Sequence, residues 1–478
     1  VLKVREQLLT AMESQIKAFY KKKTIFLTGG SGFMGRVAVE KLLRSTDAAR
    51  IYVLMRQKRG QSPQERIESW KTIPLFELLL KSKPNALERV VSISGDCEEP
   101  DLGISLADRE ILKKEVQVVL HCAATVNFFE VLHKALDINT RATRLMLELA
   151  REMQKLEAFV YVSTAFSNCV FQHITEKFYP GNLRCSADNV LKVRKLCDDM
   201  VVDGMAPALL DKFPNTYTYT KALAEQLIQT ESDKLPVCIY RPGSIVSTNR
   251  EPIPGWIDNI YGPIASMYGY VLGIIRLALM DANSPACIIP VDLSVNLLLA
   301  CAWHTATASN EFKTDRMPPT IYNHVPHAKN LITYGQFLNF VDKIRHIYPF
   351  ERTIWYPIMH TTTISWLFKV ARIFYHVVPG HVMDFVLLLR GQKPRMVRLY
   401  AKMHKAIDKM AYFSNQKWTF EATNTDQLWQ SLSIADKELF AFDMRSLDWN
   451  KFLTNGLSGL RLHLAKEEAS DESIRRAR

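Results

Sequence analysis

Tyr217 and Lys221 are four positions apart, a spacing that puts two side chains on one face of a helix. A carbonyl group that accepts a hydride develops an oxyanion, and a positioned tyrosine hydroxyl can supply the proton that it needs. We expect the Lys221 ammonium to lower the pKa of Tyr217 from its usual value of about 10, because a nearby cation favours the phenolate. Ser163 and Thr164 carry hydroxyls that can polarise the carbonyl oxygen. These four residues predict carbonyl reduction.

The stretch around this pair, NTYTYTK, is compatible with two structures. Alternating threonine and tyrosine favours a strand. Pro214 and Asn215 form a helix start signal, and the following KALAEQLIQTES has a helical pattern, so we predict a helix. Tyr219 is only two positions from Lys221 and is therefore expected to face elsewhere, into packing. The simpler alternative for Tyr217 and Lys221 is a surface pair on an ordinary helix.

The stretch TGGSGFMG places a glycine turn between a strand, TIFLT, and a helix, GRVAVEKLL. This context is typical of dinucleotide binding, because glycines let the backbone approach a pyrophosphate and the helix N-terminus attracts negative charge. The last glycine also lets the helix pack closely on the strand. A tight turn without a ligand is the alternative. The predicted cofactor contacts in this turn are Thr28, Gly29, Gly30, Ser31, Gly32, Phe33, Met34 and Gly35.

The residues after the second predicted strand, LMRQKRG, indicate which cofactor binds. An acidic residue here would hold the ribose 2′-hydroxyl of NAD. This chain has Arg56, Lys58 and Arg59 instead, and Arg36 adds a cation just past the last glycine. Guanidinium groups pair with a 2′-phosphate, so NADPH is predicted. A solvated basic loop is the alternative, and it suits Lys58 and Arg59 better than Arg56.

Two further strand ends carry candidate cofactor contacts. Asp96 follows the third predicted strand and could accept a hydrogen bond from the adenine amino group, or equally cap a turn. Ala123 and Ala124 follow the fourth strand, where small side chains leave room for the nicotinamide ribose. Lys221 is expected to hold the same ribose. All these positions lie at the carboxyl ends of strands, where ligands bind in open α/β sheets.

The elements that must position these residues form an α/β pattern. Near-continuous apolar strands alternate with helices, which predicts a doubly wound parallel sheet of the NAD(P)-binding Rossmann type. Aromatic residues become frequent after about Asn323, where a mainly helical region is expected. We predict a helical extension over 1–21, a reductase domain with substrate-binding insertions over 22–322, a helical domain over 323–465 and a charged, frayed tail over 466–478.

Composition narrows the choice of partners. The net charge of +12 suits acidic partners such as a phosphorylated cofactor, an acyl-CoA or an anionic membrane. Nucleic acid is not expected, because the sequence contains no zinc-finger, RNP or KH motif. The eight cysteines form no CxxC pair, which predicts free thiols in a reducing compartment and no metal site. The N-terminus lacks the apolar core of a signal peptide, so a cytosol-facing protein is predicted.

Two apolar segments raise the question of a membrane. Residues 259–275 carry no charge but are short and contain glycine and proline, and residues 355–389 are interrupted by Lys369, Arg372 and Asp384. Buried helices are the simpler interpretation of both. The second segment is followed by a basic run, RGQKPRMVRLYAKMHKAIDK, and this combination suits peripheral contact with an anionic membrane better than a span.

Seven stretches resemble the alcohol-forming fatty acyl-CoA reductases, which belong to the extended short-chain dehydrogenase/reductase family. They are TGGSGFMG, HCAATVNF, YVSTAFSN, PNTYTYTKALAE, YRPGSIV, EPIPGWIDNIYGP and IIPVDLSVN. WTFEATNT and FDMRSLDW resemble the helical domain of the same family, and the resemblance runs from about Lys22 to Arg461. Many animal members continue into a hydrophobic C-terminal anchor, whereas this chain stops at RRAR.

The resemblance implies roles for individual residues. Tyr217 and Lys221 match the catalytic pair, Thr164 matches the catalytic Ser/Thr position with Ser163 as second choice, and Pro242 matches a loop near the nicotinamide carboxamide. The implied reaction uses NADPH to reduce a long-chain fatty acyl-CoA to an aldehyde, with release of CoA, and then to a primary alcohol for lipid synthesis. The implied location is the cytosolic face of a peroxisomal or endoplasmic-reticulum membrane.

Two other functions are compatible with the same motifs. Extended short-chain dehydrogenases that act on a nucleotide sugar or a sterol share the fold, the cofactor turn and the Tyr/Lys pair. A cofactor-sensing scaffold without activity would share the fold, but such a protein would often lack Tyr217 or Lys221. The helical C-terminal region and the apolar content favour the acyl-CoA reductase over the dehydrogenase, and the presence of Tyr217 and Lys221 argues against the scaffold.

Overall fold

The computed structural model describes residues 13–58, 60–179, 181–311, 318–468 and 470–477. Residues 1–12 of the predicted helical extension lie outside this part, and Gln15–Tyr20 form helix α2. The centre of the molecule is a seven-stranded sheet in the order β11-β7-β5-β4-β1-β2-β3, with every neighbouring pair parallel. Its strands are β1 (Thr24–Thr28), β2 (Arg50–Met55), β3 (Val90–Ser94), β4 (Val118–His121), β5 (Ala158–Val162), β7 (Val237–Pro242) and β11 (Ile321–His324).

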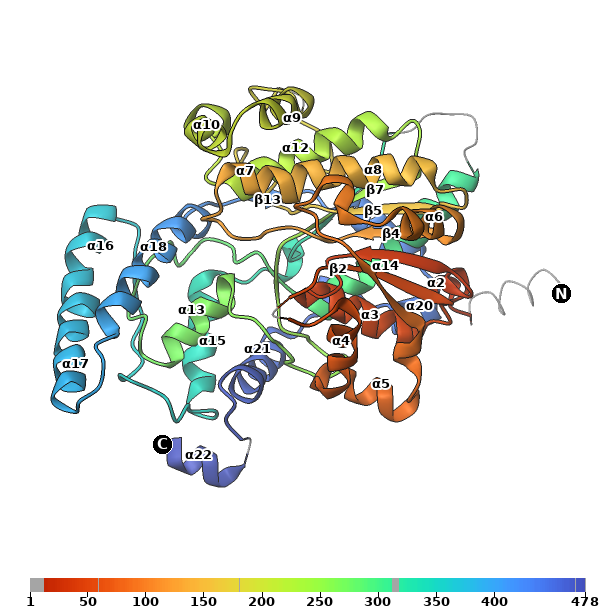
Figure 1. The fold of residues 1–478 in the computed structure, drawn as a ribbon. Coiled ribbons are helices and arrows are strands. Elements are labelled where there is room, and N and C mark those ends of the chain that lie inside the picture. The colour runs from red at the N-terminus through yellow and green to blue at the C-terminus, as the bar shows by residue number, and fades with distance from the viewer. Residues whose placement is uncertain (1–12, 59, 180, 312–317, 469, 478) are drawn as a thin grey trace.

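Helices cover both faces of the sheet, which explains why its strands are almost wholly apolar. In β1, Ile25 and Leu27 join one core cluster and Phe26 joins the other, because successive side chains point to opposite faces. The layers are visible above and below the strands in Figure 1. The first face carries α3 (Phe33–Ser45), α5 (Glu77–Ser82) and α14 (Val291–Glu311), and the second carries α6 (Leu106–Glu115), α8 (Ala142–Glu152) and α12 (Thr216–Glu231).

The strand order predicts a ligand crevice at the carboxyl ends of the strands, between β1 and β4. The chain passes from β1 to β2 and β3 on one side and then returns to place β4 beside β1 on the other side. At such a reversal the connections leave the strand ends in opposite directions, so the space outside the carboxyl ends of β1 and β4 stays open to a ligand. The predicted doubly wound fold is therefore confirmed, and all its candidate site residues lie toward these strand ends.

The C-terminal region is mainly helical and is joined to the sheet. Strand β11 contains both residues on either side of the predicted boundary at 322/323, so the sheet itself extends into the C-terminal region. The short strand β13 (Thr419–Phe420) pairs with β6 (His173–Ile174), and β12 (His360–Thr362) pairs with β9 (Leu277–Leu279). The region's main helices in the body are α15 (Tyr334–Arg345), α19 (Thr423–Ser431), α20 (Ile434–Leu439) and α21 (Trp449–Gly459), and α13 (Gly262–Val271) packs on α15.

The two ends of the described chain are each fixed by a buried acidic residue. Asp436 at the start of α20 accepts hydrogen bonds from the Ser14 hydroxyl at 2.6 Å and from the Ile16 backbone at 3.1 Å, which anchors α2. Glu467 pairs with the buried Arg461 at 3.1 Å. Residues Asp471–Ala477 form helix α22, so the expectation of a frayed tail is wrong for this segment.

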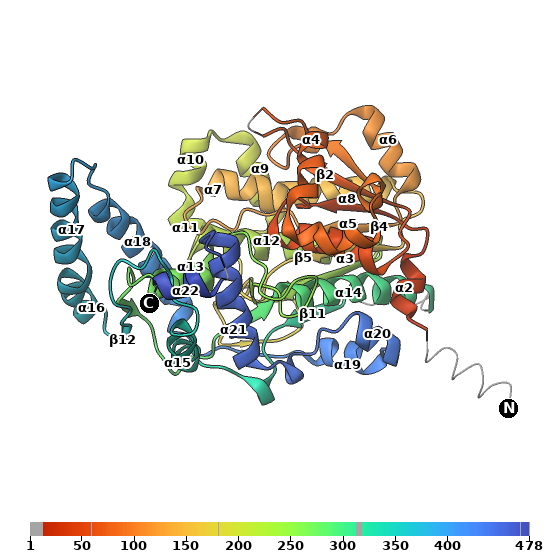
Figure 2. The ribbon, with the colours of Figure 1, turned by 90° about the horizontal axis from the view of Figure 1, so that it is seen from below.

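One part stands away from the rest of the molecule. A continuous helix formed by α16 (Ser365–Arg372), the π-turn η7 (Ile373–Val377) and α17 (Val378–Leu389) packs on α18 (Met396–Ser414). We call residues 364–414 the outer hairpin, and both views show it projecting from the body (Figures 1 and 2). Only 11% of the most apolar window in Ser365–Leu389 is buried, so the interpretation of this segment as a buried helix is wrong.

Candidate active site

The glycine turn between β1 and α3 leaves no room for side chains. A Cβ on Gly35 would lie 2.3 Å from the Gly29 carbonyl oxygen, and a Cβ on Gly29 would lie 2.8 Å from the Ala123 backbone nitrogen. Gly29 also has φ of +73°, which favours glycine. Gly32 is the N-cap of α3, so free backbone N–H groups and the positive end of the helix dipole face the crevice. The cradle fits a dinucleotide pyrophosphate.

Thr28 and Phe33 support the turn from behind. The Thr28 hydroxyl lies 2.7 Å from Nδ1 of the buried His121 and accepts from the Ala123 backbone at 3.1 Å, which ties β1 to β4 directly under the crevice. The Phe33 ring stacks on Trp256 at 5.4 Å. The other predicted contacts in the turn, Ser31 and Met34, are half-buried. Contact of these side chains with a cofactor stays a prediction.

Three arginines gather beyond the end of β2. Arg56 is half-exposed and donates to Asp96 at 3.1 Å, so two predicted cofactor contacts from β2 and β3 lie side by side. Arg66 donates to the Arg56 carbonyl oxygen at 2.6 Å. Burial and the neighbouring Arg66 lower the pKa of Arg36, whose Nη2 pairs with Asp258 and whose Nε is buried without a hydrogen-bond partner among the described residues. Such a cluster of cations fits an anionic group.

Helix α12 carries the predicted catalytic pair. The Asn215 side chain caps it by accepting from the Thr218 backbone at 2.9 Å, so the helix prediction for NTYTYTK is confirmed and the strand alternative is excluded. Tyr217, Lys221 and Glu225 follow at intervals of four on one face. Tyr219 is fully buried on the other side of the helix, where its ring meets Phe213 edge-on at 5.6 Å, as predicted.

Tyr217 pairs with Thr164 across the crevice. Burial raises the pKa of Tyr217 to about 12, and a hydrogen bond with the Thr164 side chain partly opposes that rise. The expectation that Lys221 lowers the pKa of Tyr217 below its usual value is therefore wrong for the protein alone, where burial sets the direction of the shift. The phenol is protonated at neutral pH, which is the form required of a proton donor to an alkoxide.

Lys221 sits below Tyr217 in a closed environment. Its side chain is 2% exposed, and its Nζ donates to the Val162 carbonyl oxygen at 2.6 Å and lies 4.7 Å from the centre of the Tyr161 ring. Burial lowers the pKa of Lys221 to about 8. Two of the three ammonium protons remain free for other partners, such as a ribose hydroxyl.

The two candidate hydroxyls at the end of β5 face different ways. The Ser163 hydroxyl donates to the buried Glu225 carboxylate at 2.5 Å, whereas Thr164 faces Tyr217. Glu225 also accepts from Ser167 at 2.8 Å and pairs with the fully buried Arg241 at 2.7 Å. This network fixes the loop that presents Thr164, so the geometry favours Thr164 over Ser163 for a carbonyl contact.

The remaining predicted contacts complete the rim. Ala123 and Ala124 follow β4 and are half-buried beside the glycine turn. Pro242 ends β7, and its carbonyl oxygen accepts from the Ala165 backbone at 2.8 Å, which holds the end of β7 against the Thr164 loop. Six of the seven strands thus supply candidate residues at their carboxyl ends, on the same side of the sheet.

Aromatic rings cover the other side of Tyr217. Phe128 stacks on Tyr217 with ring centres 5.7 Å apart, and it contacts Phe413 at 5.1 Å. Phe413 and Trp418 both pack against Phe166, two residues after Thr164. Phe413 belongs to the last turn of α18, so the outer hairpin reaches Tyr217 through a continuous apolar wall.

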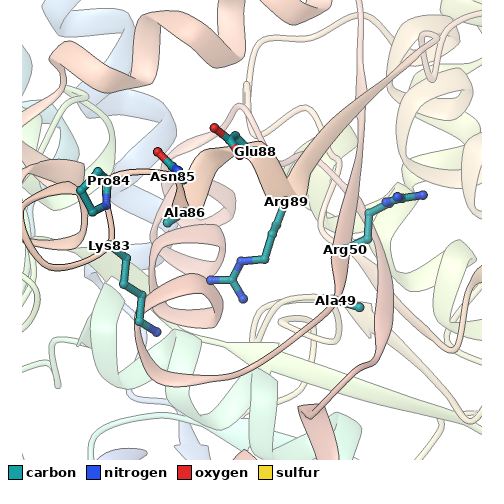
Figure 3. A pocket seen from close by; sticks show the side chains of 8 residues that line it. All are labelled: Ala49, Arg50, Lys83, Pro84, Asn85, Ala86, Glu88 and Arg89. Atoms are coloured by element: carbon teal, nitrogen blue, oxygen red, sulfur yellow. The ribbon is translucent and has the colours of Figure 1, made fainter.

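A separate hollow of about 600 Å³ lies at the amino ends of β2 and β3 (Figure 3). The Lys83 ammonium donates to the Leu43 and Arg44 carbonyl oxygens, and Arg89 donates to the carbonyl oxygens of Leu43 and Ala48. These cations complete the C-terminal end of α3, so their role is structural. The residues lining the hollow are Ala49, Arg50, Lys83, Pro84, Asn85, Ala86, Glu88 and Arg89.

Several site residues were missed by the sequence analysis. Glu225 had a local signal, since it continues the spacing of Tyr217 and Lys221 by one more turn. Arg66 had only its charge as a signal. Phe413 had none, because its contact with Phe128 joins segments that are far apart in the sequence.

Comparisons with known proteins identify the family. Two sequence models, both described as male sterility protein, match residues 27–298 and 375–467. The chain is 41% identical to fatty acyl-CoA reductase wat of Drosophila melanogaster over 466 residues, covering 97% of this chain and 89% of that protein. The chain belongs to the fatty acyl-CoA reductase family. It is also 37% identical to fatty acyl-CoA reductase 2 of Homo sapiens over 463 residues, with 95% and 87% covered.

Solved structures share the fold with this member of the fatty acyl-CoA reductase family. The terminal reductase domain of the myxalamid biosynthetic pathway superposes with a TM-score of 0.60 at 19% identity, covering 94% of this chain and 93% of that one. A reductase domain of a nonribosomal peptide synthetase from Mycobacterium tuberculosis gives 0.57 at 19%, with 96% and 95% covered. The chain is therefore an oxidoreductase of this family, with a domain that binds a nicotinamide cofactor.

Proposed function

We propose that the protein reduces long-chain fatty acyl-CoA to a primary fatty alcohol with NADPH, in two steps through an aldehyde and with release of CoA. The observation that carries this proposal is the Tyr217–Thr164 pair, placed between the glycine turn and an aromatic wall. A proton donor, a cofactor cradle and an apolar surface are the three components that reduction of an acyl thioester needs.

NADPH is favoured over NADH by the charges beyond β2. Arg36, Arg56 and Arg66 lie together there, and Arg36 Nε is buried without a partner among the described residues. A 2′-phosphate would supply the missing acceptor and offset the mutual repulsion of the guanidinium groups. Arg66→Gln is expected to raise the KM for NADPH with little effect on the KM for NADH. Arg50→Gln, at the amino end of β2, is the matched control. Equal KM changes for NADPH and NADH in Arg66→Gln would contradict the proposed preference for NADPH.

The residues around Tyr217 account for the proton transfer in each reduction. A bound reduced nicotinamide supplies the hydride. Thr164 donates a hydrogen bond to the substrate oxygen and orients it, and Tyr217 donates its proton as negative charge develops there. Lys221 holds the ribose and stabilises the phenolate that remains. Loss of the thiol from the first product leaves an aldehyde, whose oxygen takes the same place for the second reduction.

The acyl chain is proposed to lie against the aromatic wall. Phe128, Phe166 and Phe413 present apolar surface directly beside Tyr217 and Thr164. Burial of apolar area is the main source of affinity that an alkyl chain can offer. Because substrate and product both partition into lipid, we place the enzyme on the cytosolic face of a peroxisomal or endoplasmic-reticulum membrane.

A substrate panel tests the proposed reaction. Purified protein is incubated with NADPH and either acyl-CoA thioesters of increasing length or a nucleotide sugar, and the products are separated and identified. We expect NADPH oxidation and a primary alcohol only with the thioesters. Oxidation of NADPH by the nucleotide sugar alone would contradict the proposal.

A further inference from the structure

The outer hairpin has one apolar face with no partner among the described residues. Its long helix buries Phe368, His376, Gly380 and Asp384 against the rest of the molecule, at intervals of four or eight residues. Residues two positions away point in the opposite direction, to solvent. There, nine apolar residues are 45–72% exposed along the whole helix: Trp366, Val370, Ile373, Phe374, Val378, Val382, Phe385, Leu388 and Leu389.

Polar contacts hold the buried face of this helix against α18 and against Arg276. His376 Nδ1 lies 3.0 Å from His404 Nε2, and its own Nε2 accepts from the Arg276 backbone at 3.1 Å. The Asp384 carboxylate accepts from the backbone of Arg395 and Met396 at 2.7 Å each, which caps α18. The helix Ser365–Leu389 is long and apolar enough to cross a membrane, but these polar contacts keep it on the protein surface.

The hairpin also concentrates positive charge. Residues 364–414 contain nine lysines and arginines against two aspartates, so they hold +7 of the chain's net +12. Asp384 is occupied by backbone groups, and Asp408 faces Arg372 at 3.9 Å. Among the described residues, no ion pair is formed by the exposed cations Lys369, Arg390, Lys393, Arg395, Arg398, Lys402, Lys405 and Lys409.

We propose that the outer hairpin docks on an anionic lipid bilayer, with its long helix lying in the headgroup region. The exposed apolar face enters the boundary of the acyl chains, and the cations at and after the turn, Arg390, Lys393 and Arg398, pair with lipid phosphates. A helix with an apolar stripe and a strongly basic flank binds in this way, and Trp and Tyr favour that depth. A second copy of the chain fits less well, because two surfaces of +7 repel each other.

Docking in this way gives the hairpin a function in the reaction. Helix α18 has 19 residues and spans about 28 Å, from its basic start at the hairpin turn to Phe413 at the aromatic wall. The surface on the lipid and the catalytic tyrosine are therefore connected by one helix. The inference deepens the proposed membrane location and does not depend on the reductase chemistry.

Vesicle sedimentation tests the docking directly. Purified full chain is mixed with vesicles of phosphatidylcholine alone, or with vesicles that also contain about 30% phosphatidylserine. The anionic lipid gives the second kind of vesicle a negative surface potential of about −30 mV. We expect binding to the anionic vesicles and release by added salt. Arg390→Gln, Lys393→Gln and Arg398→Gln together should lower the partition coefficient by about fivefold per cation removed. Phe374→Ser, Val382→Ser and Phe385→Ser together should abolish binding.

A matched surface outside the hairpin provides the control. Lys192, Lys195, Leu196 and Met200 are exposed on α9 (Ala187–Leu196) and α10 (Asp199–Gly204), and their replacement by Gln or Ser should leave vesicle binding unchanged. NADPH oxidation with a short, water-soluble acyl-CoA should stay constant in every variant, which separates this test from that of the reaction. Failure of the wild type to bind anionic vesicles would overturn the proposal. So would equal binding by the hairpin variants. Loss of self-association in the Phe374→Ser, Val382→Ser and Phe385→Ser variant, with vesicle binding unchanged, would overturn the proposal too, because the apolar face would then join two copies of the chain.

Discussion

At the scale of residues, two tyrosines on one helix separate chemistry from packing. Tyr217 faces Thr164 in the crevice, while Tyr219 is buried on the opposite side and its hydroxyl has no partner among the described residues. Their neighbourhoods in the sequence are nearly identical, so only the helical spacing to Lys221 distinguishes them. The spacing favoured Tyr217 correctly as the residue of the crevice, and its catalytic role stays a prediction.

Tyr217→Phe removes the proposed proton donor without changing the shape of the site. We expect the rate of alcohol formation to fall by about 10²–10⁴-fold, the usual contribution of a general acid. Binding of NADPH, measured by fluorescence, should be unchanged. Tyr219→Phe is the matched control and should keep full activity, with equal or greater thermal stability because it removes an unsatisfied buried hydroxyl. Full activity in Tyr217→Phe would contradict the assignment.

The pKa of Lys221 predicts how the rate of the reaction depends on pH. Its pKa is lowered to about 8 by burial, so raising the pH through 8 removes the charge that stabilises the phenolate and kcat should fall. The unfolded chain keeps the Lys221 proton up to a pKa of about 10.4, so between these values this group makes unfolding less favourable as pH rises. A pH–rate profile with parallel thermal melts checks both. Constant kcat up to pH 9.5 would contradict the role of Lys221.

At the scale of elements, the sequence predicted the strands and the glycine turn because their signals are local. The strands β1, β2, β4, β5 and β7 are mostly apolar runs, and Gly29 and Gly35 of the turn are each required by a close backbone approach. The network around Glu225 could not be predicted, because Ser163, Ser167 and Arg241 come from three segments that only the fold brings together. The seventh strand, β11, was missed for a different reason: it has only four residues and follows a long helix.

Glu225 is predicted to stabilise the element that presents Thr164. Glu225→Ala leaves Arg241 fully buried without its carboxylate, and such a loss costs about 3–5 kcal/mol of the free energy of unfolding. Glu77→Ala removes an exposed pair with Lys81 and should leave the free energy of unfolding almost unchanged. Urea denaturation of both variants gives the comparison. Equal stability of Glu225→Ala and Glu77→Ala would show that the buried network does not hold the loop.

At the scale of the whole molecule, the C-terminal helices support the cofactor turn. A Cβ on Gly459 at the end of α21 would lie 1.8 Å from the Gly255 carbonyl oxygen, and the next residue, Trp256, stacks on Phe33 of α3. Strand β11 and the contact of α20 with α2 also join the two regions. The predicted division at 322/323 is therefore a boundary in the sequence that the sheet crosses. The separation into domains stays a prediction.

Gly459→Ala tests this connection across the molecule. The added methyl group meets the backbone of Gly255, so we expect a loss of about 1–3 kcal/mol in the free energy of unfolding and weaker NADPH binding. Gly204→Ala, at the end of an exposed helix with no atom near the added Cβ, should leave both unchanged. If Gly459→Ala bound NADPH as tightly as Gly204→Ala, the C-terminal packing would have no effect on the turn.

The stoichiometry of a single reaction tests the central claim most directly. Purified protein is given limiting palmitoyl-CoA and excess NADPH, and oxidised cofactor, free CoA and hexadecanol are quantified at completion. Reduction of a thioester to an alcohol requires two hydrides, so we predict two molecules of NADPH oxidised and one of CoA released for each alcohol formed. One NADPH per CoA with free aldehyde as the final product, or no oxidation of NADPH, would contradict the account.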